Sequence, residues 1–243
     1  MIESLLLTAA PVATYDGQRH LTNASGFFFE RDDRLFLVSS RHVMCDEPSH
    51  HHPDRLVIEV HTDPDNIAAA TGWSIPLFAN GKSLWREGLD SAGAIDIAAI
   101  EIDRDALPEN ALIDAFTPRH LSAPDALIEV GTPLLIVGFP LGFHDQLHHV
   151  PVARQAIVAS SFGLRFQGQG YFLTDARTHR GSSGAPVVMR IATPEPDQRA
   201  LPWMLLGVHS ARMDVGGRDL ALDEALGLNC AWYADILLTL TER

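Results

Sequence analysis

The sequence contains few cysteines. Only Cys45 and Cys230 occur, and they lie far apart in the chain. A secreted domain of this size usually carries several disulfides, so two free thiols and a cytoplasmic location are expected. A single bridge between the two stays open, because the sequence does not give the separation of their Cα atoms.

Positive charge and long hydrophobic runs are scarce as well. Lys and Arg number 18 against 31 Asp and Glu, which gives a net charge of −13. Such a balance repels phosphate backbones and anionic membrane surfaces, so neither nucleic acid nor membrane is an expected partner. No stretch reaches the roughly 18 apolar residues of a membrane span. The first residues also lack the positive charge of a secretory signal, so none is expected.

What the chain does contain is a series of short strand-like segments. Hydrophobic residues make up 46% of the sequence, and apolar runs bounded by Gly, Pro, Asp and Asn recur about every ten to fifteen residues. Residues 26–38 predict a hairpin with ERDDR at its turn. Helical periodicity is best in residues 107–116 and near the end of the chain. The chain is therefore expected to be mostly β.

A turn with the composition of a nucleophile loop lies in the second half of the chain. Gly181-Ser182-Ser183-Gly184 stands between the strand-like runs YFLTD and PVVMR. A serine nucleophile needs an exposed hydroxyl, a base for its proton, and backbone N–H groups that stabilise an oxyanion. Glycine lets the backbone bend that tightly. The same letters are also ordinary loop composition, so the turn alone does not decide the function.

Two upstream residues supply the missing partners. His42 directly follows an apolar strand in LVSSRHVM, and Asp96 lies inside the β-prone run DIAAIEI. A carboxylate buried in a strand requires a partner, and a histidine that must hold its proton on one nitrogen is such a partner. The chain order His, Asp, Ser is that of chymotrypsin-type triads.

On these residues the sequence resembles the trypsin-like (chymotrypsin-fold) serine peptidases, in particular the bacterial, disulfide-poor branch with Deg-type proteases and glutamyl endopeptidases. The resemblance implies a single all-β domain of two six-stranded antiparallel barrels with the active site in the cleft between them. The expected boundaries are a first barrel at about 1–102, a connector at 103–127, a second barrel at 128–228 and a short C-terminal helix at 229–241.

The resemblance also implies an activity. The chain would be a serine endopeptidase that forms an acyl-enzyme at Ser183, with His42 as general base and acid and Asp96 as the orienting acid. The backbone N–H groups of Gly181 and Ser183 would form the oxyanion hole. The substrate would be a protein or peptide, and no metal or cofactor would be required.

Substrate preference is expected from residues near the nucleophile and on the strand near the C-terminus. A hydroxyl at 178 and a histidine at 209 resemble the pair that binds a substrate carboxylate in glutamyl endopeptidases, which suggests cleavage after Glu or Asp. In the competing interpretation His209 packs within a strand and the arginines are solvated. The expected substrate-binding residues are Thr178, His209, Ser210, Arg212, Arg177 and Arg180.

Two histidine clusters raise the question of a metal. His50 to His52 lie in a polar loop, and His144, His148 and His149 lie in GFHDQLHHV. Neighbouring side chains in a loop point in different directions, and no Cys or carboxylate stands at zinc-like spacing. Solvated loops are therefore expected, and no metal site is predicted.

Two other functions compete with an active endopeptidase. An α/β-hydrolase esterase would need an apolar strand leading into the serine turn, and TDARTHR is polar. A catalytically silent or activator-dependent module that binds a peptide in its cleft would keep the same residues. The sequence does not give the oligomeric state, and an activating partner protein is compatible with it.

Overall fold

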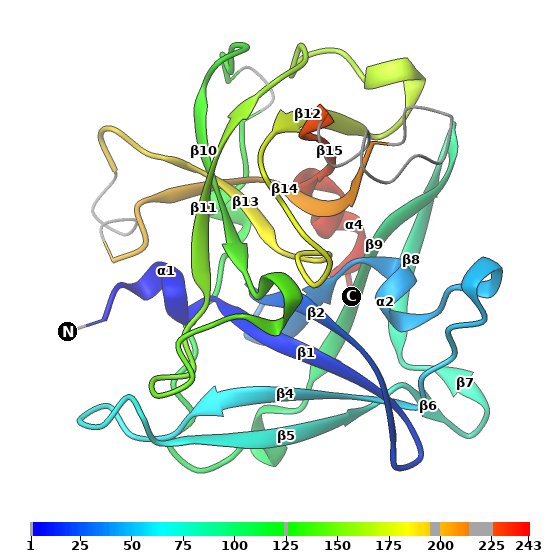
Figure 1. The fold of residues 1–243 in the computed structure, drawn as a ribbon, viewed down its shortest axis with the longest axis vertical. Helices are drawn as coiled ribbons and strands as arrows, with labels where there is room; N and C mark the ends of the chain where they lie inside the picture. Colours follow the sequence, from blue (N-terminus) through cyan, green and yellow to red (C-terminus); the bar gives the residue numbers. More distant parts are fainter. Residues whose placement is uncertain (1, 124–125, 195–199, 214–225) are drawn as a thin grey trace.

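The protein consists of two β-rich halves. The computed structural model describes residues 2–123, 126–194, 200–213 and 226–243 (Figure 1). The N-terminal half is an antiparallel seven-stranded sheet in the order β5-β4-β1-β2-β3-β9-β8, and the C-terminal half is a closed barrel in the order β10-β11-β12-β15-β14-β13. The strands of the sheet are β1 (Ala9–Asp16), β2 (Arg19–Arg31), β3 (Arg34–Ser39), β4 (Arg55–His61), β5 (Ala70–Pro76), β8 (Trp85–Asp90) and β9 (Gly93–Ile102).

The remaining elements complete the barrel and its connections. The barrel strands are β10 (Pro133–Gly138), β11 (Val152–Val158), β12 (Tyr171–Asp175), β13 (Pro186–Arg190), β14 (Trp203–Arg212) and β15 (Leu228–Tyr233). A small separate sheet pairs β6 (Phe78–Ala79) with β7 (Lys82–Ser83). Short helices are α1 (Ser4–Leu7), α2 (Arg41–Met44) and α4 (Leu237–Leu240), with 3-10 turns η1 (Glu47–Ser49), η2 (Arg104–Ala106), η3 (Pro118–His120), η4 (Pro140–Gly142), η5 (Phe166–Gly168) and η7 (Ala234–Ile236).

The prediction of two six-stranded barrels is confirmed for one half only. The C-terminal half closes as a six-stranded barrel, whereas the N-terminal half forms an open seven-stranded sheet ending in β5 and β8. In β5 only Ile75 is buried, so this end strand offers little apolar surface that closure could bury.

The hairpin predicted at residues 26–38 is confirmed. Strands β2 and β3 pair in register from Phe27↔Val38 to Arg31↔Arg34. The two turn residues, Asp32 and Asp33, have φ of 52° and 62°, the left-handed pair that matches the twist of a two-residue hairpin. This hairpin leads directly into α2.

The short C-terminal helix is confirmed as α4, but its expected start and the helical pattern at 107–116 need correction. Residues 107–116 form no helix, since Phe116 is fully buried and bridges Phe29 of β2. The predicted C-terminal helix at 229–241 begins as strand β15, and only η7 and α4 follow it. Strand β15 pairs with β12 on one side and β14 on the other, so the barrel needs this segment in extended form. Among the described residues, no helix is both long and apolar enough to cross a membrane.

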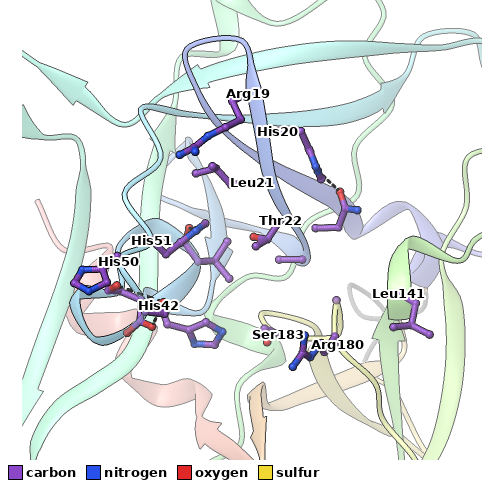
Figure 2. Close-up of a pocket in the computed structure, with 16 residues that line it drawn as sticks. Arg19, His20, Leu21, Thr22, His42, His50, His51, Leu141, Arg180 and Ser183 are labelled. Atoms are coloured by element: carbon purple, nitrogen blue, oxygen red, sulfur yellow. Dashed lines mark hydrogen bonds between the residues drawn. The ribbon is translucent and has the colours of Figure 1, made fainter.

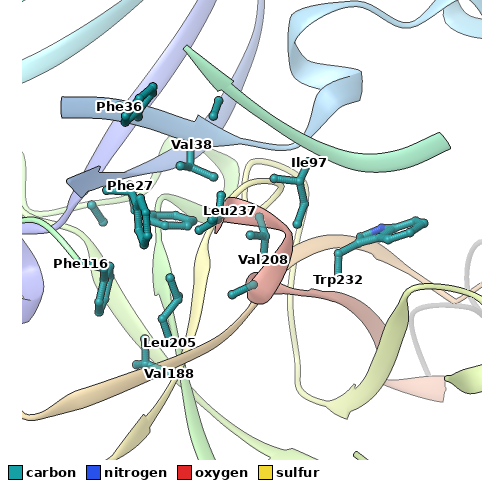
Figure 3. Packing of buried hydrophobic residues seen from close by; sticks show 14 of the residues in the cluster. Phe27, Phe36, Val38, Ile97, Phe116, Val188, Leu205, Val208, Trp232 and Leu237 are labelled. Atoms are coloured by element: carbon teal, nitrogen blue, oxygen red, sulfur yellow. The ribbon is translucent and has the colours of Figure 1, made fainter. Parts of the chain in front are cut away.

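A shared core joins the two halves and thereby fixes the elements that carry the site. Figure 3 shows Phe27, Phe36 and Ile97 of the sheet facing Val188, Leu205 and Val208 of the barrel, with Leu237 of α4 beside them. Full burial of one such side chain contributes about 1.5–3 kcal/mol. Cys45 and Cys230 are both free thiols, which decides between the two alternatives left open by the sequence.

Candidate active site

The structure brings His42 and Asp96 into direct contact. His42 lies on α2, immediately after β3, and Asp96 lies on β9, the strand beside β3. His42 Nδ1 donates to Asp96 Oδ2 at 2.7 Å, and the backbone N–H of His42 donates to Asp96 Oδ1 at 2.9 Å. Two hydrogen bonds from one residue fix both the position and the ring orientation of the histidine.

The two groups perturb each other's pKa in the direction that charge pairing predicts. Burial by itself lowers the pKa of His42, but the hydrogen bond to Asp96 and the negative charge of Asp96 outweigh it, so this pKa is raised. Burial by itself raises the pKa of Asp96, and the contacts with His42 and Ser210 outweigh it, so this pKa is lowered. Asp96 is therefore ionised at neutral pH and stabilises a protonated His42.

Ser210 of β14 completes the surroundings of the carboxylate. Its hydroxyl donates to Asp96 Oδ2, and its backbone carbonyl accepts a hydrogen bond from Ser183 Oγ at 2.9 Å. The sequence placed Ser210 among the substrate-binding residues. In the structure, its hydroxyl is committed to Asp96, and its carbonyl contacts the candidate nucleophile.

Ser183 lies in the tight turn between β12 and β13. The turn is held by hydrogen bonds from Ser25 N–H to Ser183 O at 2.9 Å and from Gly184 N–H to His209 O at 2.7 Å. Gly184 has φ of +85°, and a Cβ there would lie 2.2 Å from Ser25 O, so only glycine fits. Ser183 Oγ has no hydrogen bond to His42, and both residues are described.

Two backbone N–H groups of the same turn are available to a ligand. In the described part of the chain, neither Gly181 N–H nor Ser183 N–H donates to a protein acceptor. The carbonyl of Arg180 is directed away, since it accepts from Leu141 N–H at 2.5 Å. Gly181 has φ of +90°, and a Cβ there would lie 2.6 Å from Phe139 O. This arrangement can stabilise a developing oxyanion.

A cleft of about 680 Å³ opens beside these groups (Figure 2). Its walls are formed by β2, α2, η1 with its flanking residues, η4, and the turn at 180–183. Figure 2 shows the His42 ring directed toward Ser183, and Arg180 lies next to Ser183. Among the described lining residues, Asp46 is the only carboxylate, while Arg19, Arg180 and several histidines contribute positive or ionisable groups.

The predicted substrate-binding residues fall into separate environments. Thr178 and His209 are buried, with 3% and 2% exposure, whereas Arg177 and Arg180 are exposed. The side chain of Arg212 lies outside the described residues, although its backbone pairs with Asn229. Of the five whose side chains the structure describes, only Arg180 lines the cleft beside Ser183.

Asn229 is a residue of this region that the sequence did not single out. It is fully buried on β15 and accepts the Thr178 hydroxyl on Oδ1 at 2.5 Å. Its amide nitrogen donates to the carbonyls of Ala176 and Gly227 at 2.8 and 2.9 Å. The only signal in the sequence is an amide within the otherwise apolar run LNCAWY.

The two histidine clusters each have a carboxylate within reach, which the sequence did not predict. Side-chain ligand atoms of Glu59, His144 and His149 lie within 4.8 Å of one another, as do those of Cys45, Glu47 and His52. The partners come from segments distant in the chain or from the loop after α2, where sequence spacing gives no guide.

Comparisons with known proteins agree with this geometry. Residues 24–191 match the family model of the trypsin-like peptidase domain. The fold is similar to the crystal structure of the serine endoprotease from Yersinia pestis (TM-score 0.53, 15% identity, 97% of this chain and 62% of that one). It is also similar to the Rv3671c protease from M. tuberculosis in its active form (TM-score 0.52, 13% identity, 97% and 80%).

Those likenesses concern the fold alone, and the chain spans about three fifths of the Yersinia pestis protein, 62% of its length. No curated protein matches the sequence significantly.

Proposed function

The chain belongs to the trypsin-like peptidase domain family, and from this premise we propose that it is a serine endopeptidase, with both halves forming one peptidase domain. Ser183 attacks the scissile carbonyl, and His42 takes its proton and returns it to the leaving amine. Asp96 holds His42 in the tautomer with the proton on Nδ1 and stabilises its charged form. The observation that carries the proposal is the 2.7 Å contact between His42 Nδ1 and Asp96 beside the serine turn.

The oxyanion of the tetrahedral intermediate is assigned to the N–H groups of Gly181 and Ser183. Both lack a protein acceptor in the described part of the chain, and position 181 admits only glycine, because a Cβ there would lie 2.6 Å from Phe139 O. Preorganised N–H donors of this kind contribute about 2.7–4 kcal/mol to the transition state.

The hydroxyl of Ser183 must turn from the Ser210 carbonyl to His42 before it can react. One hydrogen bond contributes about 1 kcal/mol net, which corresponds to a factor of about five. A substrate N–H that donates to the Ser210 carbonyl would replace this contact and release the hydroxyl. The rotation therefore costs too little to prevent catalysis.

The experiment that tests the activity is digestion of a peptide library by the wild-type protein, with Ser183→Ala and Ser161→Ala alongside. Ser161 is an exposed loop serine, so its variant controls for the loss of a hydroxyl as such. We expect cleavage by the wild type and by Ser161→Ala only. Equal cleavage by Ser183→Ala would eliminate Ser183 as the nucleophile.

We also propose a preference for an acidic residue before the cut. The charge of the cleft supports an anionic substrate, because Arg19 and Arg180 face a single carboxylate, Asp46, among the described lining residues. Thr178 cannot donate to a substrate carboxylate while its proton goes to Asn229. The proposal therefore depends on Arg180, which lines the cleft, because His209 is only 2% exposed.

The same digest tests this preference through Arg180→Gln, with Arg190→Gln as control. Arg190 is exposed and stacks on Trp203 at the end of β13. Arg180→Gln is expected to reduce cleavage after Glu and Asp relative to other sites, while Arg190→Gln leaves the ratio unchanged. Cleavage mainly after Val, Ala or Leu in the wild type would exclude the acidic preference.

A second candidate function is a silent or activator-dependent module that binds a peptide in its cleft. The contact of Ser183 Oγ with the Ser210 carbonyl, in place of His42, favours it. Such a module would bind library peptides without cutting them, and an activating partner protein would restore cleavage. Cleavage by the purified wild-type chain alone would exclude this alternative.

A further inference from the structure

A group of three potential metal ligands lies outside the candidate active site, at the junction of the two halves. Glu59 lies on β4 of the sheet, and His144 and His149 lie on the loop between β10 and β11 of the barrel. Their ligand atoms are all within 4.8 Å of one another, and all three residues are half-buried. We propose that Glu59, His144 and His149 bind a zinc ion that ties this loop to the sheet.

The distances fit a tetrahedral ion. Zinc bonds of 2.0–2.2 Å to nitrogen and oxygen place neighbouring ligand atoms about 3.3 Å apart. His149 Nδ1 and Glu59 Oε2 already lie 3.0 Å apart. The remaining separations need to shorten by at most about 1.5 Å, which side-chain rotation can provide. Zinc would occupy the place of the proton between these two atoms, and that proton would move to the other ring nitrogen of His149.

The third ligand is already oriented. His144 Nδ1 lies 2.7 Å from the Gly142 carbonyl, and because a carbonyl can only accept, Nδ1 must carry the proton. In the neutral ring, Nε2 then presents its lone pair. A metal-binding histidine commonly donates its second N–H to a carbonyl in this way, which fixes the tautomer.

The loop itself is braced, so binding would require little ordering. Asp145 pairs with Val150 as a bridge, and Asp145 Oδ2 accepts from His148 Nδ1 at 2.7 Å. The His148 carbonyl accepts from His61 Nε2 at 2.7 Å. His144 and His149 each directly precede one of the two bridged residues, so the bridge restrains both. The His61 contact positions the loop beside β4.

The donor set selects the ion. Two imidazoles and one carboxylate suit zinc better than magnesium or calcium, which prefer oxygen ligands only. Three protein ligands leave one position for water, and His2Glu sets of this kind are known zinc ligands. An open position makes the ion exchangeable, so occupancy would follow the free zinc concentration.

The other cluster, Cys45, Glu47 and His52, is a weaker candidate and serves as an internal control. There the His52 ring presents Nδ1 to Cys45 Sγ at 3.6 Å and Nε2 to Glu47 at 3.7 Å. Opposite ring nitrogens cannot both face one ion, so this arrangement does not converge.

Occupancy of the proposed site would affect the candidate active site through the same loop. The loop begins with residues that contact the serine turn, since Leu141 N–H donates to the Arg180 carbonyl. A loop fixed at His144 and His149 would brace that contact. The effect on catalysis rests on the proposed function, whereas zinc binding does not.

The test is zinc titration of the whole chain carrying Ser183→Ala, followed by competition with a chromophoric chelator and by melting temperature. We expect one zinc bound at micromolar or lower free concentration, and a melting temperature that rises with zinc, because the ion binds the folded state. His144→Ala, His149→Ala and Glu59→Gln should each weaken binding at least about tenfold. Glu59→Gln keeps the side-chain shape and therefore covers a failure of the alanine variants to fold.

Gln146→Ala, which changes an exposed residue of the same loop, and the pair Cys45→Ser with His52→Ala are the matched controls and should bind zinc as before. Hydrogen exchange of residues 139–151 should slow with zinc in the parent chain and in the controls only. Absence of zinc binding, or binding that is lost only in the Cys45 and His52 variant, would overturn the proposal. A protein that cleaves no peptide yet binds zinc through these residues would refute the proposed function alone.

Discussion

Replacement of Asp96 by Asn tests how the carboxylate controls His42. Three donors converge on Asp96: His42 N–H on Oδ1, and His42 Nδ1 and the Ser210 hydroxyl on Oδ2. An amide can accept only on its oxygen, so its NH2 group must face one of these sides.

The two orientations of the amide differ sharply in free energy. An NH2 group against the backbone N–H of His42 would set two donors face to face. A backbone N–H cannot become an acceptor, so this orientation costs about 1–3 kcal/mol. An NH2 group against the ring is tolerated, because the imidazole can change tautomer and the Ser210 hydroxyl can rotate to accept. The second orientation is therefore lower in free energy. It leaves the proton of His42 on Nε2, so the ring cannot accept a proton from Ser183 on that nitrogen.

The expected loss in the rate at which Ser183 reacts is therefore about 10⁴-fold, which is what a wrong tautomer costs in a triad of this kind. The rate of labelling by a fluorophosphonate probe measures this loss, and nitrogen NMR of the histidine ring shows which ring nitrogen carries the proton. Asp46→Asn is the matched control, since Asp46 lines the cleft but makes no hydrogen bond with His42. A loss below tenfold in Asp96→Asn, or a ring that keeps its proton on Nδ1, would refute this reasoning.

Three further predictions follow from the site and its surroundings. The acid limb of the pH profile of kcat/KM should have its midpoint above the ordinary 6.5, because the raised pKa of His42 keeps the base protonated to higher pH; a midpoint below 6.5 would contradict the pairing. Gly181→Ala should destabilise the fold by about 2 kcal/mol more than Gly17→Ala in urea unfolding, because both positions have positive φ but only Gly181 would place a Cβ against backbone; equal effects would refute the contact. The thiol of Cys230, whose pKa burial raises to about 11, should resist iodoacetamide at pH 8 until the chain unfolds; rapid alkylation of the folded protein would show that the thiol is accessible and ionised.

Local chemistry made several elements predictable from the sequence. The ERDDR turn follows from two aspartates that tolerate left-handed backbone between apolar runs. The approach of His42 to Asp96 could be anticipated because a charged residue inside DIAAIEI requires a partner. In the turn, the residues that determine the outcome stand within a short stretch of sequence. For Asp96, the need for a partner is evident locally, although His42 lies 54 residues away.

What the sequence did not predict depends on partners distant in the chain. The segment NCAWYADILLTL has a helical pattern in sequence. Its first part forms strand β15 instead, because it pairs with β12 on one side and β14 on the other. The role of Asn229 is set by its hydrogen bonds with the Thr178 hydroxyl and the surrounding carbonyls, which the sequence does not show. Glu59 lies far from the histidines that it meets, so the spacing of ligands could not reveal the cluster.

The most direct test of the account is to find the atom that reacts. The purified chain is treated with a fluorophosphonate probe, and the modified peptide is identified by mass spectrometry beside the Ser183→Ala variant. The account predicts a single adduct on the peptide containing Ser183, and none in the variant. An adduct on another serine, or equal labelling of Ser183→Ala, would contradict the assignment of the nucleophile.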